Sequence, residues 1–222
     1  MATVGTLINN IRRVLQDESD TNYEDAELYQ YFNDGIDYLS KELARWNSRI
    51  AVTTTTLSYA EHAYYASLPS DFLSLASNEE GDPRIFNASN NYERLHRVEQ
   101  SDMDDWESED NDDDGTVEQF IVYGSYLYVH PRASAATTVK IYYHPLSSIT
   151  DDSSTMPWSG WFDKPVEAFV MRQCRTRSEM HEYSGADIAD YERLKAAAWD
   201  ILMLRENNTP TMRPSVGMGW TK

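Results

Sequence analysis

The chain has 222 residues, a length that suits one large domain or two small ones, and its hydrophobic content of 41% is enough for a core. Its 37 acidic and 19 basic residues give a net charge of -18, which argues against a basic nucleic-acid-binding face and against binding to anionic lipid. The sequence has neither the roughly 20 uninterrupted apolar residues of a membrane span nor the pattern of a signal peptide, so we expect a soluble protein made in the cytoplasm.

Two helices are predicted first, joined by a short polar connection over residues 17–22. Apolar residues recur every three or four positions in both, as on one face of a helix. The first stripe is Val4, Leu7, Ile8, Ile11, Val14 and Leu15, and the second is Leu28, Phe32, Ile36, Leu39, Leu43 and Trp46. Asp25 is the expected N-cap of the second helix.

The second helix contains a contradictory signal, because Asn33, Asp34 and Gly35 together are typical of a hairpin turn. The helical spacing continues on both sides of these residues, so we predict an unbroken helix. A glycine inside a helix costs about 1 kcal/mol relative to alanine, which calls for a packing reason. We expect Gly35 to admit a close contact with the preceding helix.

The middle of the chain becomes β-branched and aromatic from Ile50, and Pro69 ends the first strand region. Further strands are predicted over residues 92–98, 118–123, 126–130 and 138–144. Gly124 and Ser125 form a two-residue loop between FIVY and YLYV, which predicts a hairpin. These segments indicate a small antiparallel β domain.

Helical periodicity returns after Trp158 in two segments, which we expect Ser184 and Gly185 to separate. The lone cysteine, Cys174, cannot form an internal disulfide, and its place in the apolar pattern indicates a buried residue instead of a nucleophile. Apolar residues of the two segments are Trp161, Phe162, Val166, Phe169, Val170 and Cys174, then Ile188, Tyr191, Leu194, Ala198, Ile201 and Leu202.

The predicted fold class is α+β. Residues 1–49 and 158–207 form a four-helix bundle, residues 50–157 form an inserted β domain with an acidic loop, and residues 208–222 form an extended C-terminal tail. Large aromatic residues outside or at the edge of the helical stripes are candidates for contacts between subunits. These residues are Tyr29, Tyr38, Trp46 and Trp199.

The order of several segments resembles that of the head-to-tail adaptor (connector) proteins of tailed bacteriophages. These segments are TLINNIRRVLQDESDTNYEDAELYQYFNDGIDYLSKEL, LPSDFLSL, the hairpin ending in LYVHP, and VKIYYHP, within residues 3–207. The resemblance implies a structural virion protein at the head-tail junction. It forms a ring, usually of twelve copies, that binds the portal protein, offers a platform to the downstream tail or nozzle protein, and gives passage to DNA during ejection.

The resemblance also implies a role for the C-terminal tail, since adaptors of this family grip the portal with C-terminal segments. The candidate portal-binding residues recur at even spacing in the tail, where an extended chain would present them together. They are Met212, Val216, Met218 and Trp220. Negative charge in the bore of a ring would let DNA slide without adhesion, and the candidate residues for this lumen are Asp110, Asp112, Asp113 and Asp114.

Two other functions remain open as alternatives. Asp110, Asp112, Asp114 and Gly115 fit the first half of a calcium-binding EF-hand loop, but Ile121 occupies the position of its bidentate glutamate. A solvated acidic loop explains the run better than a calcium-responsive module does. The second alternative is a tail-associated glycan-degrading enzyme, although no paired-histidine metal motif or nucleophile elbow is present. We assign no catalytic residue, metal or cofactor.

Overall fold

A computed structural model of the chain describes residues 3–17, 22–102, 114–177 and 184–206. The fold is α+β, as predicted. It divides into two compact units, one formed by Met1–Glu42 together with Ser147–Lys222 and the other by Leu43–Leu146. We call the first the helical unit and the second the β unit, and each is described by itself.

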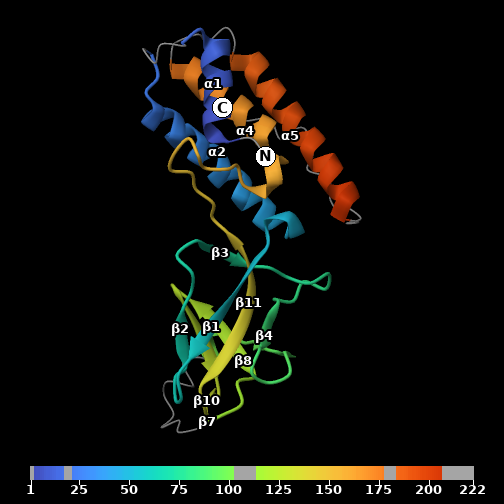
Figure 1. Cartoon of the computed structure of the whole chain (residues 1–222). Helices are drawn as coiled ribbons and strands as arrows, with labels where there is room; N and C mark the ends of the chain where they lie inside the picture. Colours follow the sequence, from blue (N-terminus) through green and yellow to red (C-terminus); the bar gives the residue numbers. More distant parts are fainter. Residues whose placement is uncertain (1–2, 18–21, 103–113, 178–183, 207–222) are drawn as a thin grey trace. The chain divides into compact units, whose positions relative to one another are not determined.

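The helical unit contains four α-helices among its described residues (Figure 1). Their bounds are α1, Val4–Leu15; α2, Asp25–Arg45, whose last turn belongs to the β unit; α4, Asp163–Arg177; and α5, Ser184–Glu206. A short 3-10 helix, η2, spans Trp158–Gly160. Helix α4 packs against both α5 and α1. The predicted break at Ser184 and Gly185 is wrong, because these residues begin α5.

The apolar stripes account for most of the core of the helical unit. Buried members include Val4, Leu7, Ile8, Ile11, Leu28, Phe32, Ile36, Leu39, Phe162, Val166, Val170 and Cys174. Three members of the stripes, Val14, Ile188 and Ile201, are exposed instead. The predicted N-cap also needs correction: the carbonyl of Glu24 accepts the first backbone hydrogen bonds of α2, and Asp25 lies in the first turn.

Helix α2 is unbroken at Gly35, as its spacing predicts, but the expected neighbour of this glycine is wrong. A β-carbon at Gly35 would lie 3.0 Å from Cδ1 of Phe169 and 3.5 Å from Cγ1 of Val166. Both side chains belong to α4, whereas the sequence suggested α1. The absent side chain therefore lets α2 and α4 approach each other closely.

The β unit contains two larger sheets (Figure 1). One sheet has the order β1 (Thr53–Tyr59), β11 (Thr137–Pro145), β4 (Ile85–Asn87) and β5 (Glu93–Arg94), and β3 (Phe72–Leu75) also pairs with β11. The other has the order β2 (Tyr65–Ser67), β9 (Tyr126–His130), β8 (Gln119–Tyr123) and β6 (His96–Arg97). Strands β7 (Asp114–Gly115) and β10 (Arg132–Ala133) form a separate pair, and η1 spans Arg49–Ala51.

The two larger sheets share one hydrophobic core. It includes Leu57, Ile85, Phe120, Leu127, Val129, Val139 and Ile141, which come from strands of both sheets. The hydroxyl of Tyr59 in β1 donates a hydrogen bond of 3.0 Å to the carbonyl of Leu127 in β9, which joins one sheet to the other. The strands therefore have one face toward this core and the other away from it.

The predicted hairpin at Gly124 and Ser125 is confirmed by the pairing of Tyr123 with Tyr126. The strand predicted over residues 92–98 is instead two short strands, β5 and β6, which belong to different sheets. The chain changes sheets at the buried Leu95, whose amide donates to the carbonyl of Ile85. Parallel pairing of β6 with β8 and of β7 with β10 departs from the predicted purely antiparallel domain.

The close contact at Gly35 predicts the effect of adding a side chain there. We expect Gly35→Val to lower the free energy of unfolding by about 1–3 kcal/mol, because the β-branched side chain would press on Phe169. Ala26→Val, at an exposed position of α2, should cost only about 0.5 kcal/mol of helix propensity. Denaturant unfolding measures the free energy of unfolding of both variants. Adding Phe169→Leu to Gly35→Val should restore part of the stability that Gly35→Val loses. Equal losses in the two single variants would contradict the contact.

Candidate interaction site

A surface of exposed tyrosines covers part of the sheet formed by β2, β9 and β8. We call it the tyrosine face; it consists of the exposed Tyr64, Tyr65, Tyr123 and Tyr126 together with Tyr128, which is half-buried. Alternation along β9 places Tyr126 and Tyr128 there, since Leu127 and Val129 point into the core. Pairing then brings Tyr65 opposite Tyr128, so tyrosines far apart in sequence become neighbours.

Tyr64, Tyr65, Tyr126 and Tyr128 of the tyrosine face form a set of contacting rings. The ring centroid of Tyr65 lies 5.1 Å from that of Tyr64, 5.3 Å from that of Tyr126 and 5.7 Å from that of Tyr128. These contacts restrain the ring of Tyr65, yet 48% of this residue remains exposed. Tyrosine offers a large apolar ring together with a hydroxyl group, and for that reason it is enriched at protein interfaces.

The aromatic residues predicted at subunit contacts occupy different environments. Tyr38 is exposed, and its ring centroid lies 5.3 Å from Nζ of Lys195. Trp46 is partly buried. Tyr29 is also partly buried, and its hydroxyl donates to Asp152 at 2.8 Å. Burial and this hydrogen bond raise the pKa of Tyr29 to about 12. Their role between subunits stays a prediction.

Trp199 does not have the exposure that the sequence suggested. Only 6% of it is exposed, and its ring packs edge-on against Phe162 at a centroid distance of 5.8 Å. The indole group therefore contributes to the core of the helical unit. Trp199 lies one position beyond Ala198 of the stripe, and its contact with Phe162, just before α4, could not be seen from the spacing along α5.

Of the acidic lumen candidates, only Asp114 lies within the described residues. It forms the start of β7, and one carboxylate oxygen lies 2.6 Å from Nδ1 of His62. Val117 enters the core and Ile121 lies in β8, so the chain after Gly115 continues as strand and not as the helix of an EF-hand. Asp110, Asp112 and Asp113 lie outside the described residues, as do Met212, Val216, Met218 and Trp220.

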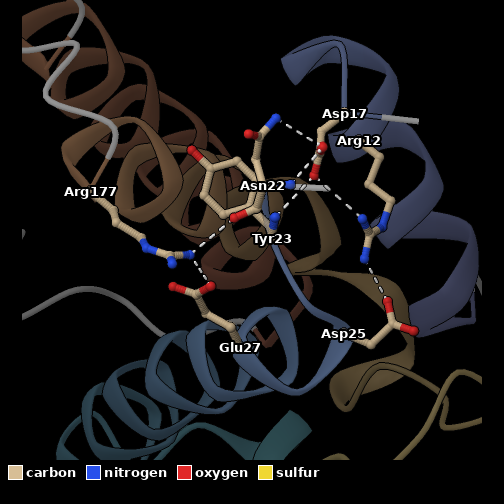
Figure 2. Close-up of polar contacts among 7 residues, drawn as sticks. All are labelled: Arg12, Asp17, Asn22, Tyr23, Asp25, Glu27 and Arg177. Carbon is tan, nitrogen blue, oxygen red and sulfur yellow. Dashed lines mark hydrogen bonds and ion pairs between the residues drawn. The ribbon is translucent and has the colours of Figure 1, made fainter. Parts of the chain in front are cut away.

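A polar cluster joins three elements of the helical unit, as Figure 2 shows. Arg12 of α1 is buried; its guanidinium lies 3.5 Å from Asp17 and 2.7 Å from Asp25 of α2. The carboxylate of Asp17, which is 1% exposed, also accepts hydrogen bonds from the amides of Asn22 and Tyr23. This carboxylate therefore holds the end of α1 against the start of α2.

The same cluster continues to the C-terminal end of α4. The hydroxyl of Tyr23 donates to the carbonyl of Cys174 at 2.7 Å. Arg177 pairs with Glu27 of α2 and donates to the carbonyl of Asn22 (Figure 2). Opposite charges face each other throughout, so the arrangement suits the joining of helices.

The described residues contain little that suggests catalysis. Burial raises the pKa of the Cys174 thiol to about 12, so this group is not an activated nucleophile. No three histidine, cysteine or acidic side chains within the described ranges come together to hold a metal ion. Within the same ranges, no helix is long and apolar enough to cross a membrane.

Comparison with known proteins agrees with an interaction role. A family model described as "SU10 adaptor protein" matches residues 2–215. No curated protein matches the chain. The match covers nearly the whole sequence, including both units and the order of segments on which the resemblance rests. The chain therefore belongs to the SU10 adaptor protein family, which makes it a structural phage protein of the head-tail junction.

Proposed function

We propose that this chain assembles as a ring, of twelve copies, between the portal and the tail of a tailed phage. The ring binds the portal on one side, offers a platform to the downstream tail or nozzle protein on the other, and encloses a channel for DNA. Membership of the adaptor family supports this role, and the tyrosine face is the observation that carries the platform. The proposal includes the four-helix bundle as the body of the ring.

The tyrosine face suits a protein partner because most of its rings are exposed, its central rings contact one another, and none of them is charged. Tyr65, Tyr126 and Tyr128 form one set of contacting rings on rigid strands, so little side-chain freedom is lost on binding. Clustered aromatic residues of this kind supply much of the binding energy of protein interfaces. We therefore assign the platform for the tail protein to the tyrosine face.

Substitution of the tyrosine face tests the platform. The double variant Tyr65→Ser and Tyr126→Ser should bind the purified tail or nozzle protein at least about tenfold more weakly, because it loses the centre of the ring cluster. Leu146→Ser, at an exposed apolar residue outside the cluster, should bind normally. Co-sedimentation with adaptor–portal rings gives the affinities. Normal binding by the double variant would remove the tyrosine face from the platform.

The second part of the proposal concerns the portal. The C-terminal segment carries Met212, Val216, Met218 and Trp220 among prolines and glycines, a composition that favours an extended peptide which orders on a partner. Trp220 is the proposed anchor, because tryptophan is the residue most enriched among the strongest contacts of interfaces. These residues would insert between portal subunits.

Truncation separates this role from folding. A chain that ends at Asn207 should unfold at an unchanged temperature, because it keeps every described helix and strand, yet it should fail to join portal rings. A chain that ends at Thr221 retains the four proposed contact residues and should bind portal as the full chain does. Electron microscopy of adaptor–portal mixtures distinguishes the two. Full portal binding by the shorter chain would disprove the role of the segment.

The third part concerns the channel, for which we propose that the acidic residues Asp110, Asp112, Asp113 and Asp114 face the bore. Asp110→Lys, Asp112→Lys and Asp113→Lys together should raise the affinity of assembled rings for duplex DNA, most strongly at low salt. The changes omit Asp114, because its carboxylate contacts His62. The control Asp34→Lys, Glu79→Lys and Glu80→Lys alters net charge equally at exposed positions. Equal DNA affinity in both variants would place the loop outside the bore.

A further inference from the structure

The five-stranded sheet has a second, chemically different surface on the side away from the core. Along β11, Val139, Ile141 and Tyr143 are buried, so Lys140 and Tyr142 project from the opposite side. Strand pairing places Lys140 beside Phe86 of β4 and Phe86 beside Arg94 of β5. In the neighbouring row, the amide of Tyr142 donates to the carbonyl of Arg84. We call this surface the cationic face; it consists of Arg84, Phe86, Arg94, Lys140 and Tyr142.

The cations of this face lie against aromatic rings. The guanidinium carbon of Arg84 lies 3.9 Å from the ring centroid of Tyr142, and Nζ of Lys140 lies 5.2 Å from the same centroid. The ring of Phe86 meets that of Tyr142 at 6.0 Å, nearly edge-on. These contacts hold the two positive groups in place on the sheet and do not neutralise them.

Arg84 and Lys140 have no carboxylate within ion-pair distance among the described residues. Elsewhere the acidic excess supplies partners, as for Lys41 with Asp37 and Arg49 with Glu79, and within the cationic face Arg94 pairs with Asp82. Strand β1 extends the surface without adding charge, because Thr54 and Thr56 lie opposite Tyr142 and Lys140. Two cations that have no carboxylate partner in the described part of the chain thus lie together on a sheet of a protein whose net charge is -18.

We infer that the cationic face binds a carboxylate-rich surface of a second copy of this chain. The inference rests on the proposed ring, for which it names a contact between copies. Every copy carries 37 acidic residues, so copies repel one another unless cations of one meet carboxylates of the next. DNA phosphates offer the same anionic chemistry to Arg84 and Lys140, so binding of nucleic acid is one of the outcomes of the test below.

Charge reversal at Arg84 and Lys140 tests this contact in the full chain. Arg84→Glu with Lys140→Glu should weaken self-association at least about tenfold by sedimentation, because like charges would then face each other. The control Arg49→Glu with Arg193→Glu has the same net charge, and its changes lie at exposed residues outside the cationic face. The wild-type association should weaken as salt rises, and that of the neutral variant Arg84→Met with Lys140→Met should depend less on salt.

Portal mixtures distinguish this inference from the proposed function. Mass photometry should show wild-type chains filling each portal cooperatively. The variant Arg84→Glu with Lys140→Glu, the Glu variant, should bind as single copies and leave portals partly occupied. The cationic contact would be overturned if the Glu variant filled portals cooperatively, or if the Glu variant and the control lost the same amount of self-association. Either result would leave the adaptor role intact. If wild-type chains do not bind to the portal even as single copies, the adaptor role itself is contradicted. If the wild type binds oligonucleotides and the variant Arg84→Met with Lys140→Met does not, the face binds nucleic acid and the inference is also overturned.

Discussion

The carboxylate of Asp17 is a constraint on which the arrangement of the helical unit depends. It is buried beside Arg12, and it accepts the amides that begin the turn into α2. A buried guanidinium that loses its partner costs on the order of 3–5 kcal/mol, so α1 cannot separate from this turn without a large penalty. Tyr23 and Arg177 carry the same constraint to α4. The direction of α2 is thereby fixed inside the unit, and α2 is the helix from which the chain enters the β unit.

Charge is distributed unevenly over the β unit, and this distribution gives its surfaces distinct chemistry. The tyrosine face presents uncharged rings, and the cationic face presents Arg84 and Lys140 against the ring of Tyr142. In a chain with twice as many acidic as basic residues, both surfaces avoid the repulsion that most of the molecule would impose on another copy. An adaptor must bind several partners at once, and chemically different faces keep those contacts separate.

The sequence predicted local features well and long-range pairing poorly. The helical stripes and the hairpin at Gly124 follow from residues close in the chain, so their spacing was sufficient. The partner of Gly35 depended on which helix α2 meets, and α4 is more than a hundred residues away. Strands β2, β3 and β4 have only three or four residues each, too few for alternation to be visible. The tyrosine face was partly visible, since Tyr126 and Tyr128 alternate with apolar residues, but its completion by Tyr65 required the pairing of β2 with β9.

The β unit is inserted in the sequence of the helical unit. The pairing of β1 with β11 lowers the conformational entropy that the helical unit loses when it closes around this insertion. Thr53 near the start of the insertion pairs with Tyr143 near its end. A flexible insertion of about 100 residues would cost the helical unit roughly 2 kcal/mol more to close than one of about 10 residues. Once β1 and β11 have paired, the helical unit closes only the short segments that flank them. All strands of the β unit precede α4 in the chain, so during synthesis this pairing can form before the last two helices leave the ribosome.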